Sequence, residues 1–135
     1  MGTPAVIGYK REDGKIESIY VHWDGYLAHT GQILKHRYLG RQKIEALMNM
    51  GNLSMLGYNP EENPVGWDYN AVQDKAESDF YCVSYRARGD KGCDKVVHEN
   101  EEDFINYITS SVPFVYLFKD GKWYYQYGGD NWKEV

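Results

Sequence analysis

The stretch IYVHWDGY, residues 19–26, decides the fold, because aromatic and β-branched side chains alternate along it before it ends at an Asp-Gly turn. Successive side chains of a strand point to opposite faces, so Ile19, Val21 and Trp23 are expected in the core. The opposite face then carries polar side chains, namely Tyr20, His22 and Asp24. Gly25 is expected to take a positive φ angle at the turn.

Two β-hairpins are predicted, one that includes the first part of this stretch and one near the end of the chain. Residues 5–10 also alternate, and the Glu12-Asp13-Gly14-Lys15 turn that follows holds the Asp-Gly dipeptide typical of type I′ hairpins. The first two strands should therefore pair antiparallel. Near the end of the chain, Phe114–Lys119 and Lys122–Tyr127 are joined by Asp120-Gly121 and form a second predicted hairpin.

Helices are predicted between these strands. His29 or Thr30 opens a helix that Gly40 interrupts, and a second apolar run ends at Gly51. Asn100 and Asp103 approximate a capping box for a third helix, which Pro113 ends. Residues 80–88 have the alternation of a further strand.

The order ββα, loop, βαββ predicts an α+β fold with an antiparallel or mixed sheet of about five strands and helices mainly on one face. A chain of 135 residues fits a single domain, residues 1–135. Residues 58–78 are too long and polar for an ordinary connection and are interpreted as a loop or lid. Trp67 and Tyr69 within it are unusual for a disordered segment, and whether they dock on the body of the protein stays open at the level of sequence.

Composition excludes several classes of protein. A net charge of −5 argues against general nucleic-acid binding, which needs a basic face. The two cysteines, Cys82 and Cys93, have no zinc spacing, so we expect reduced thiols, no metal site and no cofactor. No signal peptide or membrane span is visible, which predicts a cytoplasmic protein.

Thirteen tyrosines and four tryptophans suit the binding of flat, partly polar ligands. The candidate ligand-binding residues are those at the end of the second strand, the two arginines near residue 87 and the aromatic residues of the loop: Tyr20, His22, Asp24, Tyr26, His29, Arg86, Arg88, Trp67 and Tyr69. Arginine binds phosphate in a bidentate manner and aromatic rings stack on bases. These groups are expected to converge on one hollow.

Each candidate also has a purely structural interpretation. His22 is able to hydrogen-bond a neighbouring group, and Asp24 is able to satisfy the turn and cap the next helix. The two arginines, Arg86 and Arg88, are able to pair with acidic side chains. These alternatives stay open at the level of sequence.

The chain resembles a family of small, mostly uncharacterised proteins encoded by bacteriophages and prophages. The resemblance rests on Gly2-Thr3, the Asp13-Gly14 turn, residues 18–26, Ala87-Arg88-Gly89-Asp90 and residues 116–124. The family often has Cys where Val21 stands and Pro where Leu27 stands, so a thiol beside His22 is not expected here.

This resemblance implies a phage origin, with the host cytoplasm as the place of action. The expected function is capture of a small polar ligand, a nucleotide immune signal of the host, without catalysis. One alternative is an inhibitor that docks on a host defence protein. A second is a small phosphodiesterase or nuclease with His22 and His29 as acid and base. The expected partners are a nucleotide-like molecule or a host defence protein, without a membrane, and a homo-oligomer is left open.

Overall fold

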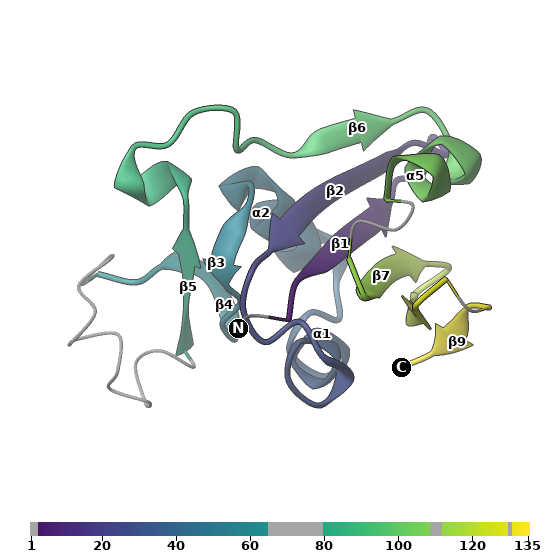
Figure 1. The fold of residues 1–135 in the computed structure, drawn as a ribbon, viewed down its shortest axis with the longest axis horizontal. Helices are drawn as coiled ribbons and strands as arrows, with labels where there is room; N and C mark the ends of the chain where they lie inside the picture. Colours follow the sequence, from purple (N-terminus) through teal and green to yellow (C-terminus); the bar gives the residue numbers. More distant parts are fainter. Residues whose placement is uncertain (1–2, 65–79, 109–111, 130) are drawn as a thin grey trace.

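The computed structural model describes residues 3–64, 80–108, 112–129 and 131–135, and within them it shows a mixed sheet (Figure 1). Its strands are β1 (Ala5–Lys10), β2 (Ile16–Val21), β3 (Leu53–Met55), β4 (Asn59–Glu62), β5 (Tyr81–Ser84), β6 (Val96–His98), β7 (Phe114–Lys119), β8 (Lys122–Tyr127) and β9 (Lys133–Glu134). They follow the order β4-β5-β3-β2-β1-β7-β8-β9, and β6 pairs with β2. The α+β class is confirmed, with nine strands in the described residues where about five were expected.

Both predicted hairpins are present. β1 and β2 pair antiparallel from Ala5 opposite Val21 to Lys10 opposite Ile16, and β1 also pairs parallel with β7. The β7–β8 turn has positive φ at both Asp120 (52°) and Gly121 (78°), as a type I′ turn requires. The β1–β2 connection is a longer loop instead: the last paired residues are Lys10 and Ile16, and only Gly14, not Asp13, has a positive φ.

Helices cover both faces of the sheet. A π-helical turn, η1 (Leu27–Gly31), leads into α1 (Gln32–Arg37), and Gly40 separates it from α2 (Arg41–Met50). α5 (Glu101–Ile108) begins as predicted, because Asn100 Oδ1 accepts the backbone N–H of Asp103 at 2.8 Å. None of the helices in the described segments has the length and apolar character needed to cross a membrane.

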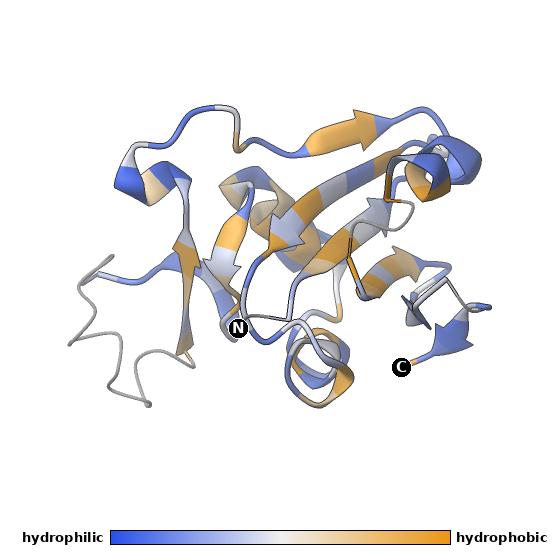
Figure 2. Ribbon diagram, viewed as in Figure 1, coloured by the Kyte–Doolittle hydropathy of each residue, from blue (hydrophilic) through white to orange (hydrophobic). Residues whose placement is uncertain are grey.

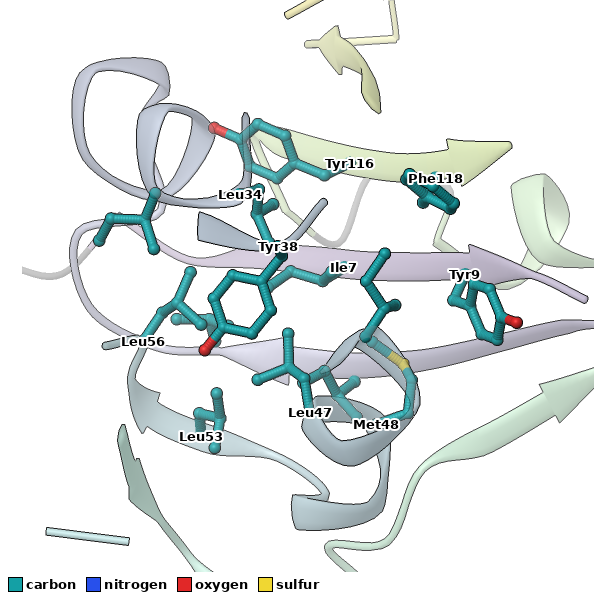
Figure 3. Close-up of a cluster of buried hydrophobic side chains, with 14 of the residues drawn as sticks. Ile7, Tyr9, Leu34, Tyr38, Leu47, Met48, Leu53, Leu56, Tyr116 and Phe118 are labelled. Atoms are coloured by element: carbon teal, nitrogen blue, oxygen red, sulfur yellow. The ribbon is translucent and has the colours of Figure 1, made fainter. Parts of the chain in front are cut away.

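Two hydrophobic clusters hold these layers together. The larger lies between the sheet and the α1–α2 pair and includes Ile7, Leu34, Leu47 and Tyr116 (Figure 3). The smaller lies on the opposite face, where Phe104 and Ile108 of α5 pack on alternate residues of β1, β2 and β7, namely Val6, Ile16, Val115 and Leu117. Helices therefore lie mainly on one face, and α5 covers only part of the other.

The end of β2 differs from the prediction. Trp23 is 40% exposed and not in the core. The backbone N–H groups of His22 and Trp23 both donate to β3, to Leu53 O at 3.0 Å and Ser54 O at 2.9 Å. Consecutive donation to one strand breaks the two-residue alternation, so Trp23 no longer shares a face with Val21.

The turn after β2 also differs. Asp24, not Gly25, takes the positive φ angle, at 57°. Gly25 is needed for close approach, because a Cβ atom there would lie 2.6 Å from the carbonyl oxygen of Thr3. Its N–H donates to that same oxygen at 2.6 Å.

The predicted strand over residues 80–88 is shorter than expected. β5 ends at Ser84 and a 3₁₀ turn, η2 (Arg86–Arg88), follows it, closed by Gly89 at φ 94°. The first residues of the expected lid form β4, which pairs parallel with β5. Trp67 and Tyr69 lie outside the described residues.

Candidate functional site

The sheet face that α5 leaves uncovered carries a polar and aromatic cluster. Val21 pairs with Leu53 in register, so their side chains share the α1–α2 face, and both are fully buried there. The neighbouring Tyr20 and Asn52 therefore face the other way. The backbone N–H of Tyr85 donates to Asn52 O at 3.2 Å, which places Tyr85 beside them. Three segments distant in the sequence thus meet on this face.

Two hydrogen-bonded phenols dominate the cluster. Tyr20 Oη lies 2.9 Å from His22 Nδ1. Burial, and secondarily the nearby Tyr85, raise the pKa of Tyr20. Burial likewise raises the pKa of Tyr85, although the charge of Arg88 and a hydrogen bond with Ser54 act in the opposite direction. Both phenols are therefore neutral near pH 7 and keep their O–H groups for hydrogen bonding.

A cavity of about 410 Å³ opens beside this cluster, between β2, β6 and α5. Its polar lining comes from Ser18, Tyr20, Asn52 and Tyr107, and its apolar lining is mostly valine. Tyr107 is 56% exposed. In Figure 2 the neighbouring β6 strand is coloured as hydrophobic. The cavity thus combines apolar walls with a few polar groups, as small-molecule sites do.

A buried contact fixes the wall of this cavity. Ser18 Oγ lies 2.8 Å from His98 Nε2, and the His98 ring lies against Phe104 and Tyr107, with centroid distances of 5.3 and 4.7 Å. Burial lowers the pKa of His98, with Asp103 opposing the shift. The neutral ring ties β6 and α5 to β2, so the cavity is held open by structured elements on three sides.

The two arginines do not form a pair. Arg88 lies over the Tyr85 ring at 5.2 Å and binds both carboxylate oxygens of Asp90, at 3.0 and 2.7 Å. Arg86 instead donates to the carbonyl oxygen of Asn49 at the end of α2, at 2.7 Å, and pairs with Asp94. It lines a different cavity, with Pro60 and Ser84. Arg88 alone is near the cluster.

The remaining predicted residues are also dispersed. Tyr26 lines a cavity of about 670 Å³ against β7 and β8, and His29 lines one of about 430 Å³ against α1. Asp24 accepts the Thr30 hydroxyl through its backbone oxygen at 2.8 Å, and no side-chain cap is formed at Tyr26, where η1 begins. The expected convergence on one hollow is therefore wrong: Tyr20 and His22 share the cluster, and the other groups of the turn lie elsewhere.

The acid–base pair considered for an enzyme is not assembled. The His22 ring contacts Tyr20 and Trp23, with centroid distances of 6.0 and 4.9 Å. The His29 ring lies near Tyr26 at 6.1 Å, and its Nε2 is buried without a hydrogen-bond partner among the described residues. Each imidazole therefore has its own surroundings.

Sequence reasoning missed three residues of the site, Asn52, Tyr85 and Tyr107. Tyr107 lies three residues after Phe104, at the edge of the apolar stripe of α5, and the sequence alone does not reveal that it is 56% exposed. Asn52 gives no signal either, because its position depends on the pairing of β3 with β2. Cys82 is not a nucleophile at neutral pH, since burial raises its pKa to about 11.

Comparison with known proteins adds no relative. No family model, no curated protein and no solved structure matches this chain. Within the described segments, no three His, Cys, Asp or Glu side chains gather closely enough to hold a metal ion. The site is therefore interpreted from its own geometry, as an aromatic and polar cavity on the open face of a mixed sheet.

Proposed function

We propose that this chain captures a nucleotide-like small molecule and holds it without chemical change. The observation that carries the proposal is the cavity of about 410 Å³ on the uncovered sheet face, lined by Tyr20 and Asn52. Ligand sites for small molecules usually span about 300–1,000 Å³ and are mostly apolar with a few polar groups. A single base with its sugar fits that size.

Aromatic groups supply the main binding energy in this proposal. Tyr107 is exposed at the cavity and its ring stands beside the buried His98, so its position is supported from behind. A base stacked on such a ring gains about 1–3 kcal/mol. Tyr20 offers a second ring in the lining of the cavity.

Arg88 is the candidate for a phosphate contact. Its side chain is half exposed and pairs with Asp90, which is itself partly exposed. Exposed ion pairs of this kind contribute little to stability, so a phosphate dianion is able to compete with Asp90 for the same guanidinium. The resemblance to phage-encoded proteins supports the further step that the captured molecule is a nucleotide signal of the host's defence.

The alternative of an inhibitor that docks on a host protein is favoured by one observation. Val96 and Val97 of β6 are 37% and 46% exposed, and Val96 lines the cavity together with the exposed Tyr107. Exposed apolar side chains of this kind suit a protein interface as well as a ligand entrance. The experiment below separates the two.

The purified protein is incubated with a panel of mono-, di- and cyclic nucleotides, washed, and heated to release what is bound, which mass spectrometry then identifies. The proposal predicts recovery of an unchanged nucleotide, and a loss of that recovery in Tyr107→Ala. Tyr127→Ala is the matched control, because Tyr127 is 55% exposed and lines a different cavity. Recovery of an altered product, or of no nucleotide at all, contradicts the proposal.

A further inference from the structure

We propose that the cavity selects rings that carry an exocyclic carbonyl oxygen, such as hypoxanthine or uracil, over rings that carry an amino group there, such as adenine or cytosine. This inference rests on the proposed nucleotide capture and names the class of base. It follows from the orientation of a single side-chain amide, that of Asn52.

The backbone of Asn52 is held on both sides. Its N–H donates to Cys93 O at 2.7 Å, and its carbonyl oxygen accepts the N–H of Tyr85 at 3.2 Å. Position and direction of the side chain are thereby fixed by two segments that lie far from it in the sequence. A residue held in this way presents the same atoms to every ligand.

The orientation of the Asn52 side-chain amide is fixed by the backbone N–H group that it contacts. Asn52 Oδ1 accepts the backbone N–H of Tyr20 at 3.0 Å. A backbone N–H only donates, so oxygen and not nitrogen must face Tyr20. The nitrogen of the amide, Nδ2, therefore points away from that contact. Nδ2 has no hydrogen-bond partner among the described residues. It is also not one of the buried polar atoms without a partner, so it is accessible to a ligand.

Asn52 lines the cavity, so Nδ2 is the atom that it offers to a ligand. Two other polar atoms of the lining are engaged within the protein, Ser18 Oγ with His98 and Tyr20 Oη with His22, and the remaining polar residue, Tyr107, is assigned to stacking on the base through its ring. The walls contributed by Val6, Val96 and Val112 are apolar. A ligand carbonyl facing Nδ2 gains a hydrogen bond, whereas an amino group there meets another donor and loses its contact with water.

The test compares inosine monophosphate with adenosine monophosphate by calorimetry, on the wild-type protein and on Asn52→Asp. The wild type is expected to bind the inosine nucleotide about fivefold or more tightly. Asn52→Asp keeps an oxygen for the Tyr20 N–H but replaces the free donor by an acceptor, so the ratio of the two affinities should reverse. Asn106→Asp is the control for charge, because Asn106 is exposed on α5, and it should keep the wild-type ratio.

The outcomes separate this inference from the proposed function. Equal affinity of the wild type for both nucleotides overturns the selectivity while nucleotide capture stands. Binding of neither nucleotide, and of no other in the capture experiment, overturns both. If Asn52→Asp fails to fold, the wild-type ratios for uridine against cytidine monophosphate and for inosine against adenosine monophosphate decide the matter by themselves.

Discussion

Asn52 completes the edge of β2 by accepting the backbone N–H of Tyr20 on its side-chain oxygen, at 3.0 Å. Along this edge β2 pairs with β6 over Ile16–Ser18 and with β3 at Val21. Between the two partners the strand ladder has a gap, and a buried N–H left there without an acceptor is costly. The gap lies where the cavity opens. The change of pairing partner along β2, from β6 to β3, therefore makes room for the candidate site.

Stacking on Tyr107 is the first prediction. Replacing Tyr107 by Ala should weaken nucleotide binding by about 1–3 kcal/mol, or roughly 5- to 150-fold, because the base loses its exposed ring. Calorimetry with the nucleotide recovered from the capture experiment measures the change. Tyr127→Ala, an equally exposed tyrosine at another cavity, should stay within about twofold. Equal losses in both variants would place the ligand elsewhere.

Gly25 is predicted to resist substitution for reasons of space. A Cβ there would lie 2.6 Å from Thr3 O and 2.7 Å from the Ala5 side chain. Gly25→Ala should therefore lower the free energy of unfolding by about 1–3 kcal/mol, measured by urea denaturation. Gly40→Ser is the control: Gly40 has open space around its Cβ position and lies at the N-cap of α2, where Ser is favoured. Unchanged stability in Gly25→Ala would show that the N-terminal segment moves aside.

Mild acid is predicted to destabilise the protein through His98. Burial lowers the pKa of His98 below the ordinary 6.5. Just below pH 6.5 the His98 ring therefore binds a proton in the unfolded chain but stays neutral in the folded protein. Stability should thus be complete above that value and fall as the pH drops below it. His98→Gln lacks the titrating ring, so its urea midpoint should change less between about pH 7.5 and about pH 5.5. The carboxylate of Glu101 titrates lower, since its pKa is held down by Lys10. Parallel pH profiles of the two proteins would refute this role for His98.

The thiol of Cys82 is predicted to be inert in the folded protein. Its pKa is raised to about 11 by burial, and its sulfur accepts the N–H of Gly57 at 3.2 Å. In a Cys93→Ser variant, which leaves one thiol, a disulfide reagent at neutral pH should label Cys82 only after denaturation. Rapid labelling of the native variant would show that the α1–α2 core opens readily.

Much of the fold was predictable because it depends on local chemistry. The Asp120-Gly121 turn, the Asn100 cap and the break at Gly40 each follow from the conformational preference of one or two residues. The strands that the prediction omitted, such as β3 and β6, have three residues each. They are too short to show alternation, and only their pairing with β2 makes them strands.

The site was predictable only in part, for the same reason. Tyr20 follows from the alternation of β2, which holds as far as Val21, and His22 comes directly after the last residue of that strand. Beyond that point the chain donates twice in succession to β3, so the placement of Trp23 and Asp24 depends on a distant segment. The two arginines are separated by one residue, but a 3₁₀ turn directs them to different partners, Asn49 and Tyr85. No local pattern reveals that turn.

Mapping of a nucleotide by amide chemical shifts tests the central claim most directly. The protein is labelled with ¹⁵N and titrated with the nucleotide recovered from the capture experiment. We predict that the largest shifts fall on Tyr20, Asn52, Val96 and Tyr107, around the cavity between β2, β6 and α5. Shifts centred instead on Tyr26, Phe114 and Tyr127, which line the cavity at β7 and β8, would contradict the assignment of the site.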